Sequence, residues 1–291
     1  MSNSISFPGL MDKVFEIDRV AFNILGKDIM WYGIIIAFGF MLAVLFAGAN
    51  CREFNWDHDS LIDGILLALP CAIIGARAYY VIFEWDYYSQ HPSEIIAIWN
   101  GGLGIYGAII ATVIAVYFFC KKRKGDILSA FDMVSMSYLL AQGIGRWGNF
   151  VNAEAHGGVT DLPWGMVING GQPVHPTFLY ESLWNALGFV VLHFLSKKRK
   201  YDGQIALGYL AWYGLGRTFI EGLRTDSLFL IPGVIRASQA LGLATFLITG
   251  VILLIQARRP HDESKLYINR IQYELSDPES GRDNAGEDPQ E

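Results

Sequence analysis

The chain has 291 residues, of which 52% are hydrophobic and 17% are charged, and its formal net charge is −6. A soluble domain usually carries about a quarter charged residues. Here the deficit falls in long uncharged runs, which indicate a lipid bilayer rather than a large soluble core. No basic face or nucleic-acid-binding motif is present, so we expect no nucleic-acid partner.

The N-terminal 28 residues contain Asp12, Glu16, Asp18 and Asp28. They lack the basic start, apolar core and small-residue cleavage site of a secretory signal peptide, so we expect no removable one.

Seven segments are apolar enough to be membrane-spanning helices, each of which needs roughly 20 mostly apolar residues. Three of them contain no charge: Ile29–Ala49, Gly101–Cys120 and Ala237–Ala257. Four others contain ionisable residues: 60–83, 127–150, 176–196 and 203–222. The sequence therefore predicts an all-α integral membrane protein with about seven transmembrane helices, in one domain over residues 1–260.

Lysine and arginine gather in alternate loops, which sets the predicted orientation. The loops Lys121–Lys124 and Lys197–Lys200 are entirely basic, whereas the loops 84–100 and 150–175 contain no Lys or Arg. This bias predicts an outside N-terminus and a cytoplasmic C-terminus. Residues 261–291 are acidic and rich in Pro, Ser and Gly, so we expect a disordered cytoplasmic tail.

Three arginines, Arg77, Arg146 and Arg217, lie within about six residues of the outer ends of their spans, which is roughly 10 Å of helix. An ionisable residue inside a membrane span is a functional hypothesis by default. Each arginine could reach the interface or pair with a carboxylate such as Glu154 or Glu221. Alternatively, the three together could hold the phosphate of a lipid head group, which the planar guanidinium suits.

Two of these arginines follow a Gly-x-Gly pattern, in Gly143–Arg146 and in Gly214–Arg217. Small residues allow helices to pack closely, and they also leave space beside the backbone. The glycines therefore serve helix packing, room for a ligand, or both.

Several common catalytic and metal-binding motifs are absent. Cys51, Cys71 and Cys120 have no CxxC motif and no Cys/His spacing suited to zinc. No HExxH, GxSxG, Walker A or glycine-rich dinucleotide loop is present. We therefore expect neither a metal nor a cofactor, and hydrolase, kinase and redox functions lose their usual support.

The segment Gly145–Gly157 has the form G-R-x-G-N-F-x-N-x-E-x-x-G. It resembles the signature of the prolipoprotein diacylglyceryl transferase family. Other parts of the chain resemble further segments of the family: Trp31–Gly33, Gly75–Arg77 with Tyr80, Gly101–Gly107, His175–Thr177 with Leu179–Glu181, and Tyr213–Arg217 with Glu221 and Arg224.

The resemblance implies a reaction in the bacterial cytoplasmic membrane, on the side of the outer leaflet. The family transfers the diacylglyceryl group of phosphatidylglycerol to the lipobox cysteine thiol of a prolipoprotein signal peptide. Glycerol phosphate leaves and a thioether forms, which is the first step of lipoprotein maturation. No metal or cofactor is implied.

The resemblance also implies site residues. Those implied for catalysis are Arg146, Arg217, Tyr106 and Tyr32. Those implied for binding phosphatidylglycerol are Arg146, Asn149, Glu154, Gly157, Arg224, Tyr213, Arg77 and His175.

Tyr106 departs from the family pattern, because many members have a histidine there, often proposed as the base for the thiol. Tyrosine is a poor base at neutral pH. The interpretations of Tyr106 as a proton acceptor and as a residue that only positions the thiol or the phosphate both stay open.

The alternative function is a transporter or channel for an anionic solute, or a lipid-binding protein without catalysis. A transport path would require polar residues in the inner half of the membrane, where the sequence offers little beyond Asp132.

Overall fold

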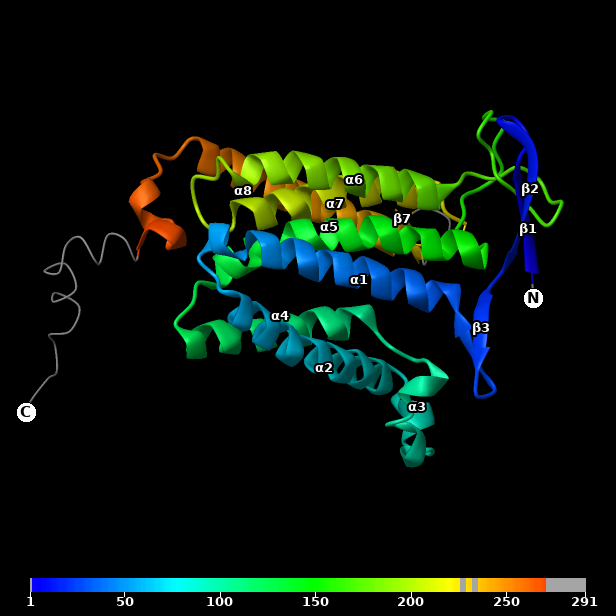
Figure 1. Cartoon of the computed structure of the whole chain (residues 1–291), viewed down its shortest axis with the longest axis horizontal. Helices are drawn as coiled ribbons and strands as arrows, with labels where there is room; N and C mark the ends of the chain where they lie inside the picture. The colour runs from blue at the N-terminus through cyan, green and yellow to red at the C-terminus, as the bar shows by residue number, and fades with distance from the viewer. Residues whose placement is uncertain (1, 226–228, 232–234, 271–291) are drawn as a thin grey trace, which may run out of the picture. The chain divides into compact units, whose positions relative to one another are not determined.

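The structure, a computed structural model, describes residues 2–225, 229–231 and 235–270. Seven long helices account for most of these residues (Figure 1). They are α1 (Trp31–Asn50), α2 (His58–Phe83), α4 (Ile105–Arg123), α5 (Ile127–Asn152), α6 (Thr177–Ser196), α7 (Gln204–Glu221) and α8 (Ala237–Ala257). Each helix overlaps one of the seven predicted spans, which confirms the prediction of a helical membrane protein.

Within the described residues, six of these helices are long and apolar enough to cross a membrane. The exception is α7, whose 18 residues include Gln204, Arg217 and Glu221. Its lower apolar content reflects the ionisable residues that it brings to the site described below.

Contacts divide the chain into two compact units, Met1–Ala47 with Phe131–Glu291, and Gly48–Ala130. The first unit contains the N-terminal strands, most of α1 and α5, and all of α6, α7 and α8. The second contains α2, the short helix α3 (Trp85–Tyr88) and α4.

In the second unit, α2 and α4 pack with their backbones in contact. A Cβ atom added at Gly75 would lie 2.6 Å from the carbonyl oxygen of Gly107, and one at Gly107 would overlap Gly75. Asp57 caps the start of α2, where its carboxylate accepts hydrogen bonds from the Ser60 amide and hydroxyl at 2.7 and 2.8 Å. Such a cap satisfies donors that the first turn of a helix leaves unpaired.

The N-terminal segment forms two β-hairpins, for which the sequence analysis predicted no structure. They are β1 (Ser2–Phe7) with β2 (Met11–Asp18), and β3 (Val20–Ile24) with β4 (Lys27–Met30). β1 also pairs antiparallel with β5 (Val167–Ile168), which gives a sheet of order β2-β1-β5. Ile5, Met166 and Phe178 form a buried core beneath this sheet, so the N-terminus is packed against the loop that follows α5.

Two features fix α7 in the first unit. The carboxylate of Asp132, in α5, is buried and accepts hydrogen bonds from the backbone N–H groups of Gly203 and Ala206, both at 2.8 Å. Asp132 therefore caps the start of α7. Near the other end, a Cβ atom at Gly214 would lie 2.6 Å from the carbonyl oxygen of Gly242, so α7 and α8 also meet backbone to backbone.

Two short strands, β6 (Phe229–Ile231) and β7 (Ile235–Arg236), lie between α7 and α8. Beyond α8, the backbone N–H of Tyr267 donates to the carboxylate of Asp202 at 2.8 Å. The described start of the predicted tail is therefore packed against the turn that precedes α7. Residues 271–291 lie outside the described part of the chain, so the prediction of disorder there is untested.

Candidate active site

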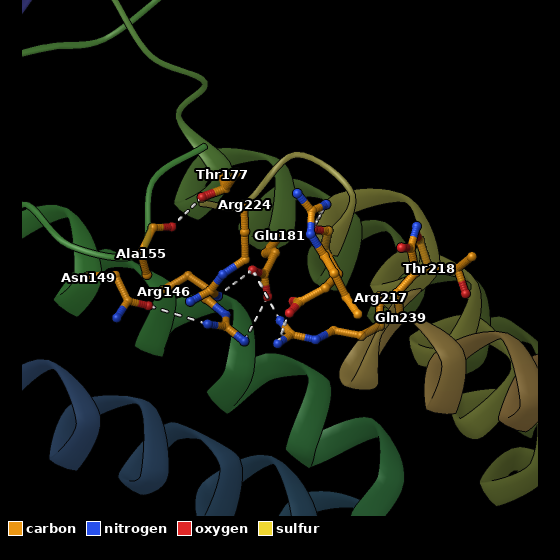
Figure 2. Close-up of polar contacts among 11 residues, drawn as sticks. Arg146, Asn149, Ala155, Thr177, Glu181, Arg217, Thr218, Arg224 and Gln239 are labelled. Atoms are coloured by element: carbon orange, nitrogen blue, oxygen red, sulfur yellow. Dashed lines mark hydrogen bonds and ion pairs between the residues drawn. The ribbon is translucent and has the colours of Figure 1, made fainter. Parts of the chain in front are cut away.

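Three arginines converge on one buried carboxylate, that of Glu181 near the start of α6 (Figure 2). Arg146 Nη2, from the last turns of α5, lies 2.7 Å from Glu181 Oε2. Arg217 Nη1, from α7, lies 3.7 Å from Oε1, and Arg224 Nη1, just after α7, lies 3.5 Å from the same oxygen. The site is therefore assembled by the ends of three helices around one anion.

A second buried carboxylate belongs to Glu221, one helical turn after Arg217. Its Oε2 lies 2.6 Å from Arg217 Nη2, and its backbone carbonyl accepts a hydrogen bond from Arg236 Nη1 at 2.7 Å. Pairing of Arg217 with Glu221 was one of the two interpretations open from sequence, and the structure confirms this ion pair.

The cluster is rich in positively charged groups. The guanidinium groups of Arg146, Arg217 and Arg224 gather around the carboxylate of Glu181, and Arg217 also pairs with Glu221. These groups are partly buried, where charges interact more strongly than they do in water. Among the described residues, no group of three or more His, Cys, Asp or Glu side chains is placed to hold a metal ion. The arrangement suits an anionic ligand.

Arg224 is held in place by pairing of its backbone. Gly157 and Arg224 form an antiparallel bridge, and the Gly158 N–H donates to the Leu223 carbonyl at 2.9 Å. A Cβ atom at Gly157 would lie 2.6 Å from the Cβ of His175 and 2.9 Å from the Leu223 carbonyl oxygen. Gly157 therefore permits a close approach between the signature segment and the segment that carries Arg224.

The signature segment leaves α5 through an unusual turn. Ala153 and Ala155 both adopt left-handed backbone conformations, with φ of 52° and 56°. Residues other than glycine rarely do so, and such strain is often found at functional sites. The Thr177 hydroxyl donates to the Ala155 carbonyl, which ties this turn to the start of α6.

The turn directs Glu154 back toward α5. Glu154 Oε1 accepts hydrogen bonds from the side-chain amides of Asn149 and Asn152, each at 3.1 Å. Asn149 Oδ1 in turn accepts a hydrogen bond from Arg146 Nη1 at 3.4 Å. Glu154 therefore acts on Arg146 through Asn149 rather than by direct pairing.

A small cavity lies beside the arginine cluster. Its lining combines charged, polar and aromatic side chains from α6 and α7: Glu181, Trp184, Asn185, Tyr213, Gly216, Arg217 and Ile220. Tyr213 and Arg217 both line this cavity, and the predicted role of Tyr213 in binding phosphatidylglycerol stays a prediction.

Gly216 makes room for a tryptophan. A Cβ atom at Gly216 would overlap the indole of Trp184, and one at Gly188 would overlap that of Trp212. The two rings stack with centroids 4.5 Å apart, and each indole N–H donates to the backbone carbonyl of the other tryptophan, at 3.0 and 2.9 Å. For Gly216 the packing interpretation is therefore right.

Two further predicted residues also lie in the first unit. The Tyr32 ring, near the start of α1, packs on α5, where a Cβ atom at Gly148 would lie 2.7 Å from it. His175 Nδ1 lies 3.3 Å from the Tyr180 hydroxyl, which accepts a hydrogen bond from the Trp164 indole at 2.8 Å. The predicted roles of Tyr32 and His175 stay predictions.

Arg77 and Tyr106 belong to the second unit. The Arg77 guanidinium is buried and donates to four backbone carbonyls, those of Glu94, Ile95, Gly101 and Gly102, at 2.6 to 2.9 Å. Tyr106 is the second residue of α4, and its side chain is partly exposed. In the structure Arg77 orders the loop that leads to Tyr106, while its predicted contact with phosphatidylglycerol remains a prediction.

Glu181 is the central residue that the predicted set of site residues omitted. The signal was present in the sequence, since Glu181 is the one ionisable residue of the span 176–196 apart from His193. Three intramembrane arginines require carboxylate partners, so an acidic residue at the outer end of a span was a candidate by the same reasoning that selected the arginines.

Fold and site together define a multi-pass membrane protein with a partly buried, arginine-rich centre between helix ends. The family model described as "Prolipoprotein diacylglyceryl transferase" matches residues 19–255. The chain belongs to this family.

Similar curated proteins share the name phosphatidylglycerol–prolipoprotein diacylglyceryl transferase. One from Finegoldia magna is 51% identical over 243 residues, which cover 83% of this chain and 96% of the relative. One from Clostridioides difficile is 46% identical and covers 78% and 90% of the two chains. One from Pediococcus pentosaceus is 44% identical and covers 86% and 93%.

Proposed function

We propose that this protein transfers the diacylglyceryl group of phosphatidylglycerol to the lipobox cysteine of a prolipoprotein. The observation that carries the proposal is the convergence of Arg146, Arg217 and Arg224 on Glu181 in a chain of this family. The names of the similar curated proteins specify the two substrates.

The reaction makes demands that this cluster can meet. The cysteine thiolate attacks the diacylglyceryl carbon that bears the phosphate, a C–S bond forms, and the C–O bond to that phosphate breaks. The electron pair leaves with glycerol phosphate, whose phosphate changes from a diester to a monoester and gains negative charge. Fixed positive groups stabilise charge that develops in a transition state, and they act more strongly where water is excluded.

We assign phosphate binding to Arg146 and Arg217, with Arg224 in support. A bound phosphodiester would pair with these guanidinium groups, and the negative charge that develops on the leaving group would be stabilised by all three. Glu181 aligns the arginines, and Asn149 with Glu154 sets the position of Arg146. Tyr213 lies beside Arg217 in the cavity, next to the phosphate that we propose there.

We assign Tyr106 to the cysteine substrate, either as the acceptor of the thiol proton or as a hydrogen-bonding partner that positions the thiol. Arg77 would act through it. By holding four carbonyls of the loop 94–102, Arg77 fixes the chain that enters α4, and so sets the position of the Tyr106 side chain.

We infer that the protein lies in the bacterial cytoplasmic membrane with its N-terminus outside and its C-terminus inside. The basic loops Lys121–Lys124 and Lys197–Lys200 support this orientation. In it, the ends of α5 and α7 that carry Arg146 and Arg217 lie in the outer leaflet, where a secreted prolipoprotein presents its cysteine.

A transfer assay tests the proposal. Purified protein in detergent would be mixed with phosphatidylglycerol and a lipobox peptide, and both glycerol phosphate release and peptide mass would be followed. We expect a mass gain of one diacylglyceryl group, which is lost in Arg146→Ala and when the peptide cysteine is replaced by serine. A folded protein that binds phosphatidylglycerol without transfer would contradict the proposal and favour a lipid-binding or transport function.

A further inference from the structure

The β3–β4 hairpin has a two-residue turn in which both residues have positive φ, Leu25 at 52° and Gly26 at 80°. Asn23 and Asp28 oppose each other across the hairpin and are joined by a hydrogen bond of 2.7 Å, and Asn23 also accepts from the Gly26 N–H at 3.0 Å. Local hydrogen bonds therefore specify a tight, well-formed hairpin.

The two faces of this hairpin differ sharply. Opposed residues share a face of a β-ladder, and alternate residues along a strand lie on opposite faces. Phe22 opposite Ile29 and Ile24 opposite Lys27 therefore lie on one face, and Asn23 with Asp28 lies on the other. Phe22 and Ile24 are about half exposed, at 49% and 52%. The hairpin is amphipathic, and its apolar face is largely uncovered in the structure.

Leu25 is unfavourable in water for two independent reasons. Its side chain is 100% exposed, and its backbone is left-handed, where turns of this type usually have Asn, Asp or Gly. Asn would suit the turn better and would expose no apolar surface. A leucine at this position indicates that the tip of the hairpin is surrounded by an apolar medium.

The position of the hairpin identifies that medium. β4 ends at Met30 and α1, a candidate membrane span, begins at Trp31, so no residue separates the hairpin from the helix (Figure 1). Met30 and Trp31 are 40% and 44% exposed, so apolar side chains are also exposed at the junction between the hairpin and α1. Tryptophan at the end of a span is typical of the membrane–water interface.

The base of the hairpin is attached to the signature segment. The Trp31 N–H donates to the Arg19 carbonyl at 3.0 Å, and Arg19 Nη2 donates to the Asn152 carbonyl at 2.8 Å. The hairpin therefore cannot turn freely about its junction with α1, and its depth is coupled to the end of α5.

We propose that the β3–β4 hairpin is an interfacial anchor that inserts Leu25 and the face of Phe22 and Ile24 into the lipid bilayer. Lys27, on the same face, extends its ammonium group to the lipid phosphates while its stem stays among apolar chains. The occupant of this face is the lipid interface. The inference depends on the membrane location of α1 and not on the transfer reaction.

Fluorescence quenching in reconstituted full-length protein tests this proposal. An environment-sensitive label would be attached in a Cys71→Ala background at Leu25→Cys, and in a control at Asp12→Cys, an exposed position on β2. The vesicles would contain phosphatidylcholine and phosphatidylglycerol. Cys51 and Cys120 are buried and should take up little label. The Cys71→Ala protein without an added cysteine measures this background.

We expect the label at position 25 to be quenched by lipids spin-labelled near the top of the acyl chain and shielded from aqueous iodide. The label at position 12 should show the reverse. Equal iodide quenching at both positions would overturn the proposal. Shielding of position 25 from both quenchers would also overturn it, since a protein surface, such as a second copy of the chain, would then cover the tip.

Discussion

Replacing Glu181 by glutamine should disable the site more than any other single change of a carboxylate. The substitution keeps the size of the side chain but removes the one charge that Arg146, Arg217 and Arg224 share. Three guanidinium groups would then face one another around a neutral amide. They would be expected to separate, because like charges in a partly buried site repel strongly.

The size of the effect follows from the contacts. Removing one partner of a buried ion pair costs about 3–5 kcal/mol, because the remaining charge stays buried and unpaired. Part of this is recovered when the arginines move toward lipid phosphates or water. If about 3–4 kcal/mol of transition-state stabilisation is lost, kcat/KM falls by about 10² to 10³, at 1.36 kcal/mol for each factor of ten.

Kinetics with phosphatidylglycerol and a lipobox peptide would measure this loss, and thermal unfolding in detergent would show that the variant folds. Glu154→Gln is the matched comparison, because Glu154 is exposed and accepts two amide hydrogen bonds that a glutamine carbonyl can also accept. There we expect a loss of about tenfold at most. Near-normal kcat/KM for a folded Glu181→Gln protein would refute the assigned role of Glu181.

Four further predictions concern folding and positioning. Asp132→Leu leaves two buried N–H groups at the start of α7 unpaired, so the free energy of unfolding should fall by about 2–4 kcal/mol in denaturant titrations. Ala155→Gly removes an alanine with a left-handed backbone, so the free energy of unfolding should rise by about 1 kcal/mol, seen as a higher Tm. Hydrogen bonds from Ser60 lower the pKa of Asp57 in the folded protein. The ionised Asp57 carboxylate therefore stabilises the fold above the ordinary pKa near 4, and this stabilisation is lost as pH falls through the lower pKa of the folded state. Asp57→Asn should flatten this dependence of Tm on acid pH. In Arg77→Lys, the single ammonium group cannot hold all four carbonyls of the loop that precedes α4. Because this loop positions Tyr106, kcat should fall about tenfold, with little change in KM for phosphatidylglycerol.

The helices could be predicted from sequence because a bilayer forces them. A span must be apolar along its whole length, and this requirement is local and easily recognised. The N-terminal strands have no such requirement. β1 pairs through Ile5 with Ile168, far away in the chain, and this pairing depends on where the loop after α5 folds. Hydropathy along a 28-residue segment does not contain that information.

The site was partly predictable for a related reason. Arg146 and Arg217 stand out because a charge inside a span is unusual, whereas their common partner is decided by how α5, α6 and α7 meet. The Gly-x-Gly pattern shows the limit clearly. A glycine indicates that something lies close to the backbone, and only the structure identifies the Trp184 ring as a neighbour of Gly216.

Each arginine of the cluster has its own support besides Glu181, and this explains how three long, flexible side chains can be held ready for one phosphate. Preorganised groups stabilise developing charge because they need not move during the reaction. The supports differ in kind. The side-chain amide of Asn149 contacts Arg146, and the carboxylate of Glu221, one turn away, pairs with Arg217. Arg224 is held by backbone pairing with Gly157. Loss of one support weakens the hold on one arginine, whereas loss of Glu181 removes a partner from all three, so effects of the supports should be smaller and should not add to that of Glu181→Gln.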